Sequence, residues 1–144
     1  MGIKEGGGVG GTVLEPRVRK YVSLGMAYLQ MGWAEGAKEE LEKALSLDPS
    51  NRIALIYAGV ACIETDDLVS AERYLRLALR HDPDSADAFA ALAKLYLRRN
   101  RPAEAAIYAK NALDKSPQLP MAVSVLAEIE IAKGCLQRAE NILN

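Results

Sequence analysis

Apolar and polar positions recur along the chain with the period of amphipathic helices. In the stretch 34–47, apolar side chains follow one another at steps of three and four residues, and charged side chains lie on the opposite side. Prolines and short polar turns separate stretches of this kind. The pattern predicts an all-α fold with helices at about 17–30, 34–47, 52–64, 68–80, 86–98, 102–113, 120–133 and from 136 onward.

The same residue types return every 34 positions without an insertion or deletion. Pro49 returns as Pro83 and Pro117, and Ala37 returns as Ala71, Ala105 and Ala139. A fixed period of this length indicates stacked repeats, each a pair of helices. We place the repeats at about 18–51, 52–85, 86–119 and 120–144. The last repeat is incomplete, since Asn144 corresponds to Glu42 of the first, and we expect the natural protein to continue.

Each repeat is marked by aromatic residues, a Leu-Gly pair, a turn glycine, small residues and a proline, or by similar residues at these positions. In the first repeat the markers are Tyr21, Leu24, Gly25, Tyr28, Gly32, Ala37, Leu41, Ala44 and Pro49. Their order resembles the tetratricopeptide repeat family. The resemblance implies a right-handed superhelical solenoid with a concave groove, and a protein that binds other proteins and is not an enzyme.

The resemblance assigns the groove to one face of the first helix in each repeat. The groove positions are Val22, Met26, Leu29, Ile53, Ile56, Val60, Ile63, Ala90, Lys94, Leu97, Arg98, Met121 and Glu128. Equivalent positions stand side by side in a stacked array, so the apolar members are expected to form one strip. That strip is Val22, Met26, Ile56, Val60 and Ile63. By the same reasoning, Lys94 is expected to pair with Glu128, and Arg98 with Glu64.

A large exposed apolar surface usually marks a binding site. We therefore predict noncovalent binding of a hydrophobic or amphipathic segment of a partner protein. A charge placed at Ile56 or Val60 is expected to abolish this binding and to preserve helicity. A weaker resemblance, to bacterial tetratricopeptide lipoproteins of type IV pilus assembly, adds the hypothesis that the protein helps to assemble a bacterial complex.

Two alternative functions stay open at this stage. In the first, the domain is architectural and self-associates through its groove or its uncapped C-terminal end. In the second, it is an adaptor for the acidic C-terminal peptide of a chaperone. Co-chaperone members of the family hold that peptide with Lys and Asn side chains, but this chain has other residues where the clamp is expected. Those residues are Val22, Met26, Tyr57, Asp87 and Ala91.

The first twelve residues contain six glycines, which cost too much backbone entropy to order without burial. We therefore predict a flexible segment over residues 1–16, followed by the repeat domain at 17–144. Three of these glycines, Gly6, Gly8 and Gly11, formally match a dinucleotide-binding fingerprint. The strand, helix and acidic residue that this fingerprint requires are missing from the sequence around it, so we assign no cofactor.

Composition and charge narrow the function further. With 18 basic and 19 acidic residues the net charge is −1, which gives no general attraction to nucleic acid. Residues for catalysis are few: the one histidine, His81, lies at a predicted helix end without a nucleophile at motif spacing. Cys62 and Cys135 do not form a metal-binding pattern. We predict no enzyme activity, metal, cofactor or membrane insertion, and leave open a cytoplasmic or periplasmic location.

Overall fold

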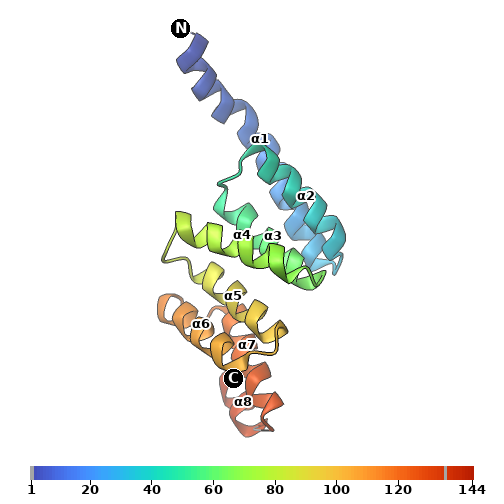
Figure 1. The fold of residues 1–144 in the computed structure, drawn as a ribbon, viewed down its shortest axis with the longest axis vertical. Coiled ribbons are helices and arrows are strands. Elements are labelled where there is room, and N and C mark those ends of the chain that lie inside the picture. The colour runs from blue at the N-terminus through green and yellow to red at the C-terminus, as the bar shows by residue number, and fades with distance from the viewer. Residues whose placement is uncertain (1, 135) are drawn as a thin grey trace.

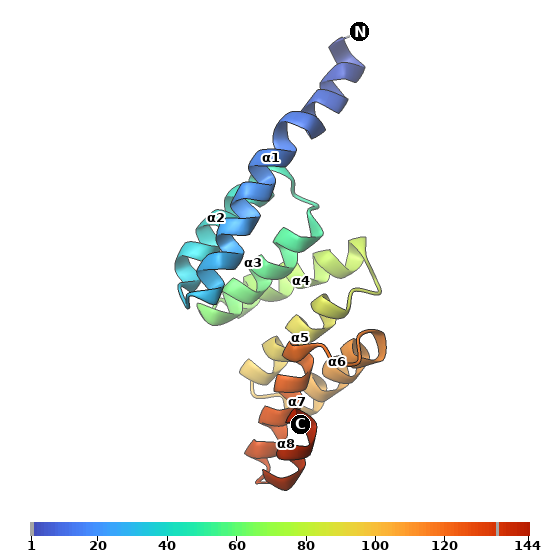
Figure 2. The same ribbon diagram turned by 180° about the vertical axis from the view of Figure 1, so that it is seen from behind.

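The structure, a computed structural model, describes residues 2–134 and 136–144. Over these residues the chain forms eight α-helices and no β-strand. They are α1 (Gly2–Gln30), α2 (Ala34–Leu47), α3 (Arg52–Glu64), α4 (Leu68–His81), α5 (Ala86–Arg98), α6 (Pro102–Lys115), α7 (Pro120–Ala132) and α8 (Leu136–Leu143). Consecutive helices form pairs that stack along the long axis of the molecule, as Figure 1 and the view from behind in Figure 2 show. The predicted all-α fold is confirmed.

The backbone keeps the register of the repeat. The helices α2, α3 and α5 have their predicted bounds, while α4, α6 and α7 differ from them by one or two residues at the C-terminal end. The turn inside each pair carries one residue with positive φ at the same repeat position. These residues are Gly32 (81°), Asp66 (64°), Asn100 (64°) and Gly134 (78°). Glycine adopts this conformation freely, and Asn and Asp adopt it more readily than other residues.

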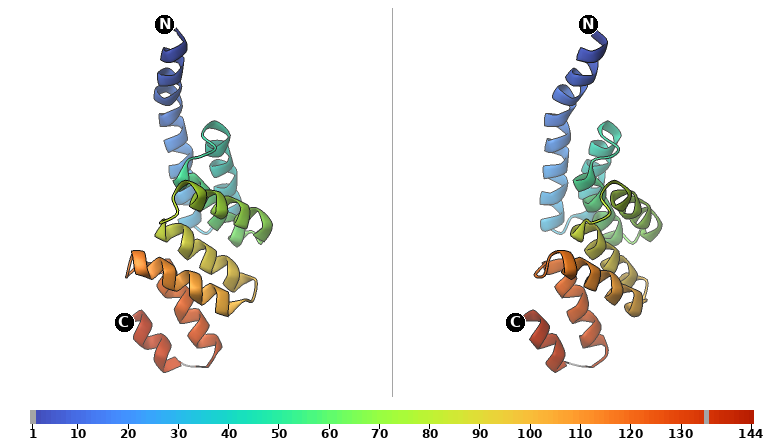
Figure 3. Two further views of the ribbon diagram at one scale, coloured as in Figure 1. Left: turned by 60° about the vertical axis from the view of Figure 1, so that its left-hand side comes forward. Right: turned by 90° about the vertical axis from the view of Figure 1, so that its left-hand side faces the viewer.

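The glycine-rich segment is helical in the structure. We predicted a flexible segment over residues 1–16, but α1 begins at Gly2 and contains Pro16. Since α1 already packs against α2 and α3, each added helical residue gains a backbone hydrogen bond without a new nucleation cost. Glycine weakens such a helix by about 1 kcal/mol per residue, and proline lacks the N–H donor. Figure 3 shows this extension projecting beyond α2, and its mobility stays a prediction.

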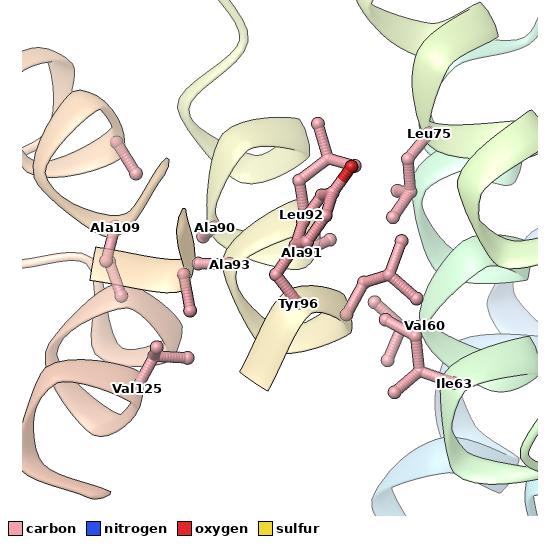
Figure 4. Packing of buried hydrophobic residues seen from close by; sticks show 14 of the residues in the cluster. Val60, Ile63, Leu75, Ala90, Ala91, Leu92, Ala93, Tyr96, Ala109 and Val125 are labelled. Atoms are coloured by element: carbon pink, nitrogen blue, oxygen red, sulfur yellow. The ribbon is translucent and has the colours of Figure 1, made fainter. Parts of the chain in front are cut away.

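Small side chains fill the core between the later helix pairs. One buried cluster joins α3, α4, α5, α6 and α7, and it consists mainly of alanine, leucine and valine. Figure 4 shows residues of α5 in the middle, with Val60, Ile63 and Leu75 on one side and Ala109 and Val125 on the other. Because α5 contacts both neighbouring pairs, it couples the repeats into one packed structure.

Two glycines let the helices of a pair approach closely. A Cβ atom added at Gly25 would lie 2.5 Å from Cγ of Leu41, and one added at Gly59 would lie 2.7 Å from Cγ of Leu75. Both leucines are fully buried. In the third repeat the positions equivalent to Gly59 and Leu75 are both alanine, Ala93 and Ala109. In each of the first two repeats, a glycine on the first helix thus makes room for a leucine on the second helix.

Candidate functional site

A hollow of about 520 Å³ lies between α1, α3 and the start of α5. We call it the aliphatic hollow, because most of its wall is apolar. It is lined by Glu15, Val18, Arg19, Val22, Ser23 and Met26 of α1, by Asn51, Ile53, Ile56 and Tyr57 in and before α3, and by Asp87 of α5. Two further hollows in the part of the chain that the structure describes have more polar walls.

Helical spacing brings these apolar side chains together. Val18, Val22 and Met26 are four residues apart, so they form one stripe along α1. Ile53 and Ile56 are three residues apart and face that stripe from α3. Val22 and Ile56 are almost covered and form the floor, whereas Ile53 keeps 54% of its surface exposed. The hollow therefore has a closed apolar floor and an open apolar rim.

Of the two further hollows, one lies where the turn between α1 and α2 meets α3 and α5, and the other lies between α5 and α7. A small hollow of about 250 Å³ is lined by Leu29, Gly32, Ala34, Val60, Glu64 and Lys94. A charged hollow of about 440 Å³ is lined by Lys94, Leu97, Arg98, Asn100 and Glu128. Lys94 belongs to both, so the two hollows adjoin. The groove face thus changes from aliphatic near α1 to charged near α7.

Glu64 holds both cations of the charged hollow. Lys94 Nζ pairs with Glu64 Oε2, and Arg98 Nη2 lies 3.9 Å from Glu64 Oε1. Arg98 Nη1 also donates a hydrogen bond of 3.0 Å to the carbonyl oxygen of Ile63. The predicted pair of Lys94 with Glu128 is therefore wrong, and the pair of Arg98 with Glu64 is present but long. Among the side chains that the structure describes, none forms a salt bridge with Glu128.

Ten of the thirteen predicted groove residues line one of the three hollows. Val22, Met26, Ile53 and Ile56 line the aliphatic hollow, Leu29 and Val60 the small one, Leu97, Arg98 and Glu128 the charged one, and Lys94 lines two. Ile63 and Ala90 are fully buried in the core, so their predicted place in the groove is wrong. Met121 packs against that core and lines none of the three hollows. A binding role for the other ten stays a prediction.

The sequence-based set missed several residues of the aliphatic hollow. Val18 precedes Val22 by one helical turn, and this spacing was a signal for it. Asn51 caps α3, where its side-chain oxygen accepts a hydrogen bond of 2.9 Å from the N–H of Ala54. Ser23 and Tyr57 also line the hollow: Tyr57 was considered only as a position of the missing clamp, and no motif in the sequence distinguishes Ser23 from other surface residues. The hollow is thus larger toward the N-terminus than predicted.

The main polar cluster outside the groove joins α4, α5 and α6. Glu72 accepts hydrogen bonds from Arg99 Nη1 at 2.7 Å and from the hydroxyl of Tyr96 at 3.0 Å. Arg76 donates to the hydroxyl of Tyr108 at 3.0 Å. The hydrogen bond from Arg99 keeps the pKa of the Glu72 carboxyl below its ordinary value. Because its members bond to one another, this cluster joins the repeats and is not a candidate site.

The remaining candidate chemistry is structural too. Burial raises the pKa of the Cys62 thiol to about 11, so this thiol stays protonated at neutral pH. Cys135 lies outside the described residues. Within 2–134 and 136–144, no group of three or more His, Cys, Asp and Glu side chains is placed to hold a metal ion. None of the helices described is both long and apolar enough to cross a membrane.

Comparisons with known proteins agree on one fold. The tetratricopeptide repeat profile matches residues 28–95, whereas no curated protein sequence matches significantly. A thermophilic TPR protein of Thermus thermophilus superimposes with a TM-score of 0.77 at 16% identity, covering 88% of this chain and 71% of that one. MamA gives 0.66 at 24% identity, covering 92% of this chain and 80% of that chain.

A third similar structure was solved with a ligand. It is the second TPR domain of the human RPAP3 protein in complex with the HSP70 peptide SGPTIEEVD. Its TM-score is 0.68 at 20% identity, covering 81% of this chain and 98% of that one. The predicted solenoid is confirmed by these superpositions and by the stacked helix pairs. The chain thus matches the tetratricopeptide repeat family over residues 28–95, and its helix pairs form the solenoid fold of that family.

Proposed function

We propose that this protein binds a hydrophobic or amphipathic segment of another protein noncovalently, and that the segment lies in the aliphatic hollow. One observation carries the proposal: Ile53 stands 54% exposed at the rim of a concave apolar site of about 520 Å³. Exposed apolar surface in a concavity is typical of a binding site. The activity we infer is binding alone, without a catalytic step.

The energetics of burial support this proposal. Covering apolar surface stabilises a complex by about 25 cal/mol per Å², so covering roughly 200 Å² contributes about 5 kcal/mol before the ordering cost of the segment is subtracted. The apolar floor formed by Val22 and Ile56 is already almost covered. Most of the gain is therefore expected from the rim, where Ile53 and the half-buried Met26 are available to a partner.

The solved complex of RPAP3 with an HSP70 peptide supports peptide binding as a use of this fold. We do not infer that this chain binds an acidic peptide. Where co-chaperones have a basic clamp, its hollow is lined by Val22, Met26 and Asp87. By binding a segment of one protein, the domain would act as a scaffold. We keep the hypothesis that the complex assembled on this scaffold is a bacterial one.

Two matched variants test the proposal. Ile53→Gln is expected to weaken capture of the partner from native lysate about tenfold or more, since a buried isoleucine contributes roughly 1.5–3 kcal/mol. Ile107→Gln is the control, because Ile107 of α6 is 59% exposed and lines none of the three hollows. Equal capture by wild type and both variants would contradict the proposal. Recovery of this chain alone would favour the architectural alternative.

A further inference from the structure

In the described part of the chain, the positive charges along the groove have ion-pair partners, whereas two of the negative charges do not. Each of its cations already has a carboxylate partner. Arg19 Nη2 lies 2.8 Å from Glu15 Oε2, and Lys94 and Arg98 both pair with Glu64. Two acidic side chains of the groove, Asp87 and Glu128, have no such partner among the described residues.

These two acids flank the apolar surface. Asp87 lines the aliphatic hollow together with Ile53 and Ile56, and Glu128 lines the charged hollow at the other end of the groove. Both side chains are exposed, so a partner can reach them. The charges that the groove leaves unpaired are therefore negative at both ends.

We propose that the segment bound in the groove is an amphipathic α-helix whose apolar face is flanked by lysine or arginine. This inference rests on the proposed function and names the chemistry of the partner. A basic side chain beside Asp87 or Glu128 gains an ion pair without breaking one. An acidic segment would meet these two carboxylates and would have to displace Glu15 or Glu64 from the cations that they hold.

The polar groups of the aliphatic hollow favour a helix over an extended peptide. An extended segment needs partners for its backbone N–H and C=O groups, whereas a helix bonds them internally. Asn51 is already engaged, since its oxygen caps α3 and its nitrogen donates a hydrogen bond of 3.2 Å to Asp48 Oδ2. The aliphatic and thioether side chains that form most of the wall offer no strong hydrogen bond, and the two hydroxyls of Ser23 and Tyr57 are too few for the backbone groups of an extended segment. Apolar anchors spaced three and four residues apart on a helix suit such a wall.

Two synthetic peptides test this proposal directly. Both are fluorescent, capped helices of about 16 residues with leucine at positions i, i+3, i+4 and i+7. They differ only in two flanking residues on each side, which are lysine in one peptide and glutamate in the other. Fluorescence anisotropy with the full chain at low salt is expected to show about fivefold or greater preference for the lysine peptide, and this preference should shrink as salt is added.

Two pairs of substitutions test whether the preference for the lysine peptide comes from the acidic residues of the groove. Asp87→Asn together with Glu128→Gln is expected to reduce the preference to about twofold or less. Glu39→Gln together with Asp114→Asn is the control, because it removes the same charge from positions that line none of the three hollows. Ile53→Gln should weaken both peptides alike.

The outcomes separate this inference from the proposed function. Equal affinity for the two peptides, or tighter binding of the glutamate peptide, would overturn the inference of a basic partner while leaving groove binding in place. A preference that the control pair reduces as much as the groove pair would overturn it too. Binding of neither peptide would contradict both proposals.

Discussion

Leu75→Ala is expected to lower the free energy of unfolding by about 3 kcal/mol, because the substitution leaves a cavity in a packed core. Leu75 is fully buried and belongs to the cluster that joins five helices. Its side chain lies over the backbone of Gly59, where an added Cβ atom would lie 2.7 Å from both Cγ and Cδ2 of Leu75. A leucine therefore fits at position 75 only because residue 59 is glycine.

A double-mutant cycle measures this dependence. Gly59→Ala alone is expected to destabilise the protein by roughly 1–3 kcal/mol, because the new methyl group overlaps Leu75. In the Leu75→Ala background the same change should stabilise by up to about 1 kcal/mol, since it fills part of the cavity and favours the helix. The third repeat already has this combination, in Ala93 and Ala109. Urea unfolding of the wild type, the two single variants and the double variant gives the four free energies of unfolding. If the effects of the two substitutions simply add, Gly59 and Leu75 do not pack against each other as described.

Ile56→Gln is expected to cost about 3 kcal/mol or more, while Ile53→Gln should change stability by less than about 0.5 kcal/mol. Ile56 is only 7% exposed, whereas Ile53, three residues earlier on the same helix, is 54% exposed. Thermal or chemical unfolding monitored by circular dichroism measures both variants. Equal destabilisation would mean that the floor and rim of the hollow are assigned wrongly.

This contrast changes the choice of variants for binding experiments. From the sequence, a charge at Ile56 or Val60 was expected to preserve the fold. Both residues are 7% exposed, so a charged side chain there would be buried and is expected to disrupt the fold. A substitution of Ile53 is expected to weaken binding without destabilising the fold.

The repeat register made most of the fold predictable from the sequence. Prolines end the helix pairs, and Gly32 marks the first turn, so a fixed spacing transfers these bounds to every repeat. The positive φ angles of Asp66 and Asn100, at the positions equivalent to Gly32, show that the spacing is followed even where the residue type changes. The helical extension of α1 was missed, because glycine content argues against a helix when packing and continuity are not known.

The site was less predictable, because burial depends on how neighbouring helices tilt. Ile53 and Ile63 are the same residue type on the same helix, yet Ile53 is half-exposed and Ile63 is fully buried. Periodicity places both on the inner side of α3 but does not tell which one a neighbouring helix covers. The ion pairs were ambiguous for a similar reason. Lys94 has acidic residues at equivalent positions or near them on both adjacent helices, and the geometry selects Glu64.

Site-specific photo-crosslinking tests directly whether a partner protein binds in the groove. A photoreactive amino acid is placed at position 53 in one protein and at position 107 in another, and each is irradiated in native cells. Both positions hold exposed isoleucines, but only residue 53 lines the aliphatic hollow. If the partner binds in the aliphatic hollow, position 53 should give a discrete covalent adduct with another protein and position 107 should give none. No adduct from position 53, or the same adducts from both positions, would contradict binding in this hollow.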